Sequence, residues 1–339
     1  MKQRRILISR TDRVGDVVMI TPMARELKKK YPDAYIATLT QPNTSKIFYN
    51  NPYVDKIITD DLSKESFWDV VKEIRSCKFT DGLLVYPTER AAYQMFWAGI
   101  RNRIGVGRIL YEVITFMKSV SRNNYIPLRH EADYCMDLAR KIGVVTDNIQ
   151  PEIFLSDEEK KWADDYMESR NISNKFRIIL HTGSLNSSAN WSEKKFLRLI
   201  KEILEDKRGK DFVIMLTALE MTAEFKSEIA EINDSRIIDV TNDLHDLRDL
   251  IKIISSIDLM ICSSTGPIHI SDALDKKSIG IYCHRPANSK KLWGVINKKS
   301  VDIEVSEEFC DMHCSEDKNT CAFENGISIE EVLKHINIT

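Results

Sequence analysis

The residues that most clearly suggest a chemical role lie in the segment 263–269, which reads Ser-Ser-Thr-Gly-Pro-Ile-His. This segment follows an apolar stretch at 259–262 and precedes a short helical pattern. A turn of small residues between a strand and a helix leaves backbone N–H groups free at the positive end of the helix dipole. Such N–H groups bind phosphate. The segment therefore predicts a site for a ligand that contains a diphosphate.

A carboxylate near the N-terminus is the second candidate. Asp16 follows Gly15 in a polar segment, 11–16, between an apolar strand pattern at 6–8 and a helical pattern at 17–30. One interpretation is helix capping, because Asp is favoured near helix N-termini. The other is general base catalysis, in which a carboxylate takes the proton of an attacking hydroxyl. We expect Asp12, in the same segment, to hydrogen-bond its own turn.

Further polar residues follow predicted strands. Thr182, Gly183 and Ser184 come directly after the apolar strand pattern at 177–180. Their hydroxyls and amides suit a phosphate or a ribose, although an ordinary strand-to-helix loop is polar as well. His269 lies about one turn into the helix after the 263–269 segment, where it suits either ligand contact or a core position.

Three arginines, Arg101, Arg103 and Arg108, follow an aromatic run and alternate with apolar residues. The plainer interpretation is a solvated loop beside an amphipathic helix that packs on a sheet. The functional interpretation is a surface for an anionic acceptor, since guanidinium groups bind carboxylates and phosphates well. The same surface would also suit anionic lipid headgroups. Arg13, in the 11–16 segment, is a further candidate for contact with an anionic acceptor.

The cysteines form one group near the C-terminus, Cys310, Cys314 and Cys321, with His313 among them. A structural zinc site is one alternative, but the paired C-x-x-C spacing of strong zinc sites is missing. We predict neither a metal site nor a cofactor. Trp191, directly before a predicted helix, is interpreted as a packing anchor rather than a platform for a base.

The elements that position these residues alternate between strands and helices along the whole chain. This order predicts an α/β fold with parallel sheets covered on both faces. The pattern restarts in the middle, so we predict two domains, 1–155 and 156–339. Ligands of open α/β sheets lie beyond the carboxyl ends of the strands. We therefore expect the two sheets to face a central cleft lined by the loops at 11–16, 181–190 and 263–269.

Composition narrows the class of protein. The chain is 43% apolar and 29% charged, with a net charge of −2, so nothing indicates general binding to polyanions such as nucleic acid. No apolar run approaches the roughly 20 residues of a membrane span. The apolar run after the basic N-terminus is too short for a signal peptide. The seven cysteines are mostly scattered, which favours a reducing cytoplasm.

The three loops together resemble those of one known family. The segment 6–22 resembles the opening of the lipopolysaccharide heptosyltransferases, glycosyltransferase family 9, with its apolar strand, Gly-Asp and a Pro early in the helix. The segment 263–269 resembles the second signature of this family, Thr-Gly followed after two residues by His. The segment 181–192 resembles its donor-side loop, in which a Trp precedes a helix. The three matches occur in the family's order over nearly the whole chain.

The resemblance implies the GT-B fold, two Rossmann-like domains, and inverting transfer of a sugar from a nucleotide diphosphate without a metal requirement. It implies Asp16 as catalytic base, an acceptor-binding N-terminal domain with Arg13, Arg101 and Arg103, and a C-terminal domain that binds the nucleotide sugar. The donor-binding residues implied are Thr182, Gly183, Ser184, Glu220, Ser263, Ser264, Thr265, Gly266 and His269. The expected donor is ADP-heptose, and the expected acceptor is a lipopolysaccharide core or a related surface glycan at the inner face of the cytoplasmic membrane.

Two positions depart from the family pattern. Ala189 stands where members often carry Lys or Arg, and Ser264 stands where many carry an acidic residue. Both changes remove charge from the expected donor site. Two alternatives therefore remain open: a transferase of the same fold that uses another nucleotide sugar, and a protein that binds a nucleotide sugar without catalysis.

Overall fold

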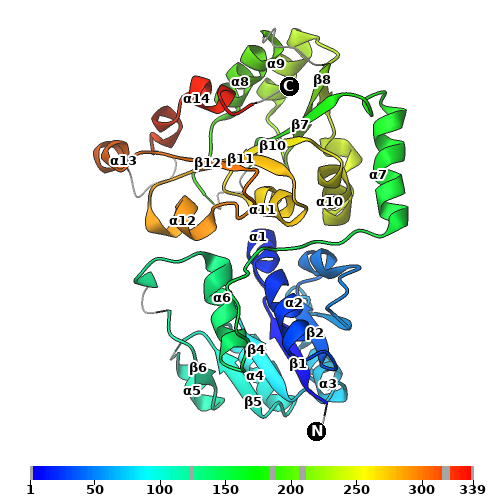
Figure 1. Cartoon of the computed structure of the whole chain (residues 1–339), viewed down its shortest axis with the longest axis vertical. Coiled ribbons are helices and arrows are strands. Elements are labelled where there is room, and N and C mark those ends of the chain that lie inside the picture. Colours follow the sequence, from blue (N-terminus) through cyan, green and yellow to red (C-terminus); the bar gives the residue numbers. More distant parts are fainter. Residues whose placement is uncertain are drawn as a thin grey trace. The chain divides into compact units, whose positions relative to one another are not determined.

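The computed structural model describes residues 3–107, 109–122, 125–183, 188–205, 211–314 and 321–336. The chain divides into two compact units (Figure 1). Unit 1 is Met1–Phe154 and unit 2 is Leu155–Thr339. Within the described part of the chain, no helix combines the length and the apolar character needed to span a bilayer.

Unit 1 is built on a six-stranded parallel sheet with the order β3-β2-β1-β4-β5-β6. The strands are β1 (Arg5–Ser9), β2 (Tyr35–Thr40), β3 (Lys56–Thr59), β4 (Asp81–Leu84), β5 (Asn102–Gly105) and β6 (Lys118–Ser119). The helices are α1 (Val14–Val18), α2 (Thr21–Lys30), α3 (Phe67–Ser76), α4 (Glu89–Trp97), α5 (Leu110–Ile114) and α6 (Glu131–Arg140), with the 3₁₀ turn η1 (Thr44–Phe48).

Alternation along β1 explains why this sheet has helices on both faces. Leu7 belongs to a buried core with Val70 of α3 and Met95 of α4. Its neighbours Ile6 and Ile8 point to the opposite face and are fully buried as well. Helices α2 and α6 pack against each other, while α3 packs against α4. A strand with apolar residues at consecutive positions therefore indicates a sheet that is covered by helices on both faces.

Unit 2 repeats this plan with a six-stranded parallel sheet in the order β12-β11-β10-β7-β8-β9. Its strands are β7 (Phe176–His181), β8 (Phe212–Thr217), β9 (Ile237–Asp239), β10 (Leu259–Ser263), β11 (Lys277–Tyr282) and β12 (Val301–Glu304). Its helices are α7 (Asp157–Ser169), α8 (Glu193–Glu205), α9 (Ala223–Ile232), α10 (Leu247–Ser255), α11 (Gly266–Ala273), α12 (Lys290–Trp293), α13 (Glu307–His313) and α14 (Ile329–Leu333). The 3₁₀ turns are η3 (Thr241–Asp243), η4 (Pro286–Asn288) and η5 (Phe323–Gly326).

If the strands of each unit are numbered one to six along the chain, both sheets have the order 3-2-1-4-5-6 of the Rossmann fold. The order reverses between β1 and β4 in unit 1, and between β7 and β10 in unit 2. Ligands bind at such reversal points, beyond the carboxyl ends of the strands. The predicted α/β class with two parallel sheets is thus confirmed, and two of the three predicted loops follow a strand at the reversal point of unit 2.

Several element boundaries differ from the prediction. The helix expected at 17–30 is two helices, because α1 ends at Val18 and α2 begins at Thr21 with Pro22 in its first turn. Proline lacks an N–H and disfavours helical backbone in the preceding residue, so it suits a helix start rather than an interior. The basic segment around Arg103 contains the strand β5.

Candidate active site

The carboxylate of Asp16 is positioned by the end of β1 and the short helix that follows. The amide of Arg10 still donates to Leu39 O of β2, at 3.0 Å, so Arg10 continues the sheet beyond Ser9. Helix α1 begins at Val14, and Asp16 lies within its first turn. The N-cap residue is Arg13, which makes no side-chain cap hydrogen bond. Asp16 is therefore not the N-cap, although as the acidic residue of the first turn it still interacts favourably with the helix dipole.

The buried guanidinium of Arg10 is the centre of a polar network. Its Nη2 donates to Asp16 Oδ1 at 2.5 Å, and its Nε donates to Asp12 at 3.1 Å and 3.2 Å. Its Nη1 donates to Glu131 Oε1 at 3.0 Å and contacts Cys135 Sγ at 2.9 Å. The side chain of Arg10 is only 4% exposed, so these acceptors take the place of water around its charge.

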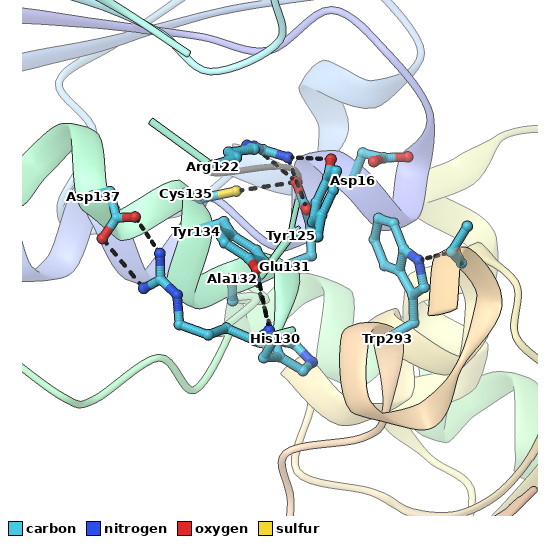
Figure 2. A network of polar contacts seen from close by, with 12 residues as sticks. Asp16, Arg122, Tyr125, His130, Glu131, Ala132, Tyr134, Cys135, Asp137 and Trp293 are labelled. Atoms are coloured by element: carbon cyan, nitrogen blue, oxygen red, sulfur yellow. Dashed lines mark hydrogen bonds and ion pairs between the residues drawn. The ribbon is translucent and has the colours of Figure 1, made fainter. Parts of the chain in front are cut away.

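Helix α6 supplies the other side of the network. Glu131, the first residue of α6, also accepts from Arg122 at 3.1 Å and 3.2 Å. Figure 2 shows the Arg122–Glu131 pair, with Cys135 on one side of it and Asp16 on the other. Tyr125 Oη lies 3.0 Å from Arg122 Nη1. Two arginines and three carboxylates thus share one cluster at the carboxyl edge of the sheet, with Arg10 and Glu131 buried and the other three partly buried.

Burial raises the pKa of both aspartates in this cluster. The pKa of Asp16 is raised by desolvation and by the charge of Glu131, while Arg10 and Arg13 act in the opposite direction. The pKa of Asp12 is raised to about 6, again chiefly by burial. A carboxylate with a raised pKa is a better proton acceptor, and Arg10 keeps it ionised enough to act. The expected role of Asp12, a bond to its own turn, is incomplete, because Arg10 is its main partner.

The loop after β10 in unit 2 carries the predicted diphosphate site. Thr265 is the N-cap of α11 in extended backbone conformation, but its side chain makes no cap hydrogen bond and contacts Cys262 Sγ at 3.8 Å instead. Gly266 is the first residue of the helix. Ser264 O accepts from Ser188 Oγ at 2.6 Å, which ties this loop to the loop after β7. The N-terminus of α11 therefore lacks a side-chain cap from its own N-cap residue.

Two buried hydroxyls near these strand ends have no hydrogen-bond partner within the described part of the chain. Thr182 Oγ1 follows β7, and Ser263 Oγ ends β10. The backbone of Thr182 is held on both sides, by Thr217 O at 3.1 Å and by Asn190 Nδ2 at 2.6 Å. A buried hydroxyl without a partner is available to hydrogen-bond a bound ligand or a water molecule.

The remaining donor-site predictions lie at varied positions. His269 is buried in α11, and its ring centre lies 5.9 Å from that of Trp293. The indole N–H of Trp293, which is labelled in Figure 2, donates to Ala287 O. Gly183 is half-buried after Thr182, and Glu220 is exposed between β8 and α9. Ser184 lies outside the described residues. Trp191 is buried and packs on Phe196, as expected for a packing anchor.

Two predicted acceptor residues need correction. The guanidinium of Arg103 is buried inside unit 1, where it donates to Thr115 O and Ile100 O and lies over the ring of Phe96. Desolvation lowers its pKa. Arg101 is exposed, but it precedes β5 and so lies at the amino edge of the sheet, opposite the edge that holds Asp16. Neither belongs to a site around Asp16, whereas Arg13 is exposed two residues before Gly15.

The cysteine group lines a small cavity in unit 2. Its walls are Cys283, Val305, Phe309, Cys310, His313, Cys314, Cys321 and Phe323. Arg285 donates through Nε to Cys314 Sγ at 2.7 Å. Over the residues that the structure describes, no three His, Cys, Asp or Glu side chains are arranged to hold a metal ion. Cys283 joins this group only in the tertiary structure.

The residues that sequence analysis missed are Arg10, Arg122 and Glu131. Arg10 had a local signal, since a charged residue at the end of a buried strand needs partners. Arg122 and Glu131 lie only nine positions apart, but the contact that joins this pair to the candidate site, from Glu131 to Arg10, spans 121 positions and leaves no local signal.

Comparison with known proteins agrees with the fold and the motifs. Two Rossmann-like units with parallel sheets define the GT-B class of glycosyltransferase folds. The model of glycosyltransferase family 9 (heptosyltransferase) matches residues 67–322, more than half of the chain, so the chain belongs to this family.

Individual relatives are distant in sequence. The chain is 26% identical to a Haemophilus influenzae protein that carries the provisional description of a glycosyltransferase, over 98% of this chain and 96% of that protein. It is 21% identical to the lipopolysaccharide core heptosyltransferase OpsX of the same organism, over 89% and 86% of the two chains.

Solved structures show the same fold. A family 9 glycosyltransferase from Veillonella parvula aligns with a TM-score of 0.81 at 18% identity, covering 98% of this chain and 95% of that one. The E. coli ADP-heptose lps heptosyltransferase II aligns with a TM-score of 0.76 at 15% identity, covering 99% and 98%.

Proposed function

We propose that the chain is an inverting heptosyltransferase that moves a heptose from ADP-heptose to a lipopolysaccharide core or a related surface glycan. Membership of glycosyltransferase family 9 supports a glycosyl transfer. The names of two relatives, one a lipopolysaccharide core heptosyltransferase and one an ADP-heptose enzyme, support this donor and acceptor. The observation that carries the proposal is the ionic contact of Arg10 with Asp16 at the reversal point of unit 1.

In the proposed reaction, Asp16 is the general base. Its carboxylate takes the proton of an acceptor hydroxyl as that oxygen attacks the anomeric carbon. The bond between the anomeric carbon and the diphosphate oxygen breaks in the same displacement, and the diphosphate leaves with the electron pair. Arg10 positions the carboxylate of Asp16, because its Nη2 donates to Asp16 Oδ1 at 2.5 Å. The raised pKa of Asp16 favours the proton transfer.

Unit 2 is the proposed donor-binding domain. The N–H of Gly266, the first residue of α11, would donate to the diphosphate, and the helix dipole would stabilise the charge of the diphosphate as it leaves, without a metal ion. Pro267, the next residue, has no N–H to offer. The hydroxyls of Thr182 and Ser263 would gain partners in the donor, because both are buried and lack partners within the described residues. The remaining proposed donor contacts are Gly183, Ser184, Glu220, Ser264 and His269.

Unit 1 is the proposed acceptor-binding domain, with Arg13 as the cation that meets acidic groups of the glycan. An acceptor of this kind is anchored in a membrane by its lipid part. We propose that the chain works in the cytoplasm at the inner face of the cytoplasmic membrane.

A panel of ADP-, GDP- and UDP-sugars tests the proposal, with binding and product formation measured separately. Binding of ADP-heptose and transfer to a lipopolysaccharide core acceptor are expected. Turnover with a different nucleotide sugar only would favour the second candidate, a same-fold transferase, which the uncharged Ala189 and Ser264 specifically support. Binding without product from any donor would instead indicate a non-catalytic nucleotide-sugar-binding protein.

A further inference from the structure

Helix α5 of unit 1 buries its one charged side chain, Glu112, and exposes its three aliphatic side chains, while Tyr111 is partly buried against the core. Glu112 is 1% exposed and Thr115, directly after the helix, is fully buried, whereas Leu110 is 73% and Val113 61% exposed. Phe116, the next residue, is 78% exposed. Soluble helices normally bury the apolar face and expose the polar one. The inversion therefore needs an explanation other than core packing.

The buried polar groups of α5 hold it in this orientation. The carboxylate of Glu112 accepts from the amides of Val106 and Gly107, both at 3.1 Å. The carbonyl of Thr115 accepts from Arg103 Nε at 3.0 Å. These bonds fix the helix to the end of β5, so the outward apolar residues cannot turn inward without leaving buried polar groups unpaired.

The apolar ridge consists of the exposed residues Ile109, Leu110, Val113, Ile114 and Phe116. Phe116 has a positive φ of 54°, which is unusual for a bulky residue and costs conformational energy. The chain thus accepts backbone strain at the residue that presents its ring to solvent. Contiguous exposed apolar residues of this kind mark a surface that meets a partner.

Charge around the ridge favours one kind of partner. The segment 98–122 contains five basic residues, Arg101, Arg103, Arg108, Lys118 and Arg122, and a single acidic residue, Glu112, which is buried. Of the basic residues that the structure describes, Arg101 and Lys118 are exposed. Lys118 donates to Asn102, the neighbour of Arg101, so both cations flank the same end of the ridge. No acidic side chain of this segment faces the solvent among the described residues.

We propose that the ridge 109–116, flanked by Arg101 and Lys118, is a docking surface for an anionic lipid bilayer. The apolar side chains enter the boundary between headgroups and acyl chains, and the cations contact the headgroups. A second copy of this chain fits less well, because two identical cationic surfaces would repel each other. This inference rests on the proposed function, in which unit 1 binds an acceptor that is anchored in a membrane. The test of membrane binding, however, needs no substrate.

Cosedimentation of the full chain with vesicles tests the proposal directly. We expect binding to vesicles of phosphatidylglycerol and phosphatidylethanolamine, weaker binding to phosphatidylcholine alone, and loss of part of the binding at high salt. The double variant Leu110→Ser and Phe116→Ser should bind at least about tenfold more weakly. Lys118→Gln should bind about fivefold more weakly at low salt. Val145→Ser, at a site that is 93% exposed on the same unit, is the matched control and should bind like the unchanged chain.

A second measurement guards against misfolded variants and against the other occupants. Phe116→Trp should show a blue-shifted emission on addition of anionic vesicles and quenching by brominated lipid. Equal vesicle binding by the unchanged chain and the double variant would overturn the proposal. So would a dimer in light scattering that the double variant abolishes while vesicle binding stays absent. Vesicle binding by a chain that transfers no sugar would leave this inference intact and count against the proposed function alone.

Discussion

The Nη2 atom of Arg10 lies 2.5 Å from Oδ1 of Asp16, and the same guanidinium reaches Glu131 at 3.0 Å. One buried cation therefore serves the end of β1, the first turn of α1 and the first residue of α6. Because Arg10 offers a planar set of donors, it can hold the base in one orientation while neutralising a second carboxylate. This contact makes the chemistry of Asp16 depend on residues far from it in sequence.

Replacing Asp16 with Asn should abolish most activity without unfolding the chain. Asn keeps the shape of the side chain but cannot take the acceptor proton, so turnover should fall by about 10²–10⁴-fold. Thermal unfolding should change little, since Arg10 keeps Asp12 and Glu131 as partners. The same assay on Asp33→Asn, an exposed carboxylate of unit 1, provides the control. A turnover of Asp16→Asn close to that of the unchanged chain would remove Asp16 from the mechanism.

Activity should rise with pH along a limb that lies above the ordinary carboxyl range. The pKa of Asp16 is raised above 3.8 by burial, so the base is ionised only at a higher pH than a solvent-exposed aspartate. In Arg10→Met, the loss of the positive charge should shift this limb of the kcat/KM profile to still higher pH. The variant should also be destabilised by about 3–5 kcal/mol, because Glu131 and Asp12 lose a buried partner. An unchanged limb in Arg10→Met would show that Arg10 does not set the protonation of the base.

The contribution of Asp12 to stability should fall as pH rises. Its pKa is about 6 in the folded chain and ordinarily 3.8, so the folded state binds the proton more tightly than the unfolded state. This contribution is fully present below about pH 3.8 and is lost as pH rises through about 6. Denaturant unfolding of the unchanged chain and of Asp12→Asn should be compared across this pH window. The free energy of unfolding of the unchanged chain, minus that of Asp12→Asn, should decrease as pH rises. A difference that grows with pH would contradict the raised pKa.

Replacing Thr182 with Val should stabilise the free chain and weaken donor binding. The hydroxyl of Thr182 is buried without a partner among the described residues, so its removal should raise the free energy of unfolding by about 1 kcal/mol. If the hydroxyl binds the donor, affinity for the nucleotide sugar should fall by about tenfold. Thr38→Val in β2 removes a similarly buried hydroxyl of unit 1 and should stabilise the chain without any effect on donor affinity. Equal donor affinity in both variants would exclude Thr182 from the donor site.

The two neighbouring arginines of the basic segment should respond differently to alanine. Arg103→Ala removes donors from two buried carbonyls and should cost about 3 kcal/mol of unfolding free energy. Arg101→Ala, at an exposed position, should change it by less than about 0.5 kcal/mol. Denaturant titrations of both variants measure this contrast, and similar midpoints would contradict the buried position of Arg103.

Much of the fold was predictable because its signals are local. Apolar runs such as 177–180 and 259–262 indicate buried strands from neighbouring residues alone, and they lie within β7 (Phe176–His181) and β10 (Leu259–Ser263). The strand β5 was missed because its sequence, Asn-Arg-Ile-Gly, contains a charged residue, and Arg103 is buried only because its guanidinium donates to the backbone carbonyls of Ile100 and Thr115. The helix α6 was also missed, although it supplies Glu131 to the candidate site.

The amino-acid sequence by itself determined the α/β class and the place of Asp16 and Thr265 after buried strands, since strand and helix periods and small-residue turns act over a few positions. Only the tertiary structure decided which charges surround Asp16, that Arg103 is internal, and that α5 presents its apolar side chains to the solvent. Those outcomes depend on which segments come into contact when the chain folds. Residues as far apart as Arg10 and Glu131 have no feature in their local sequence that predicts this contact.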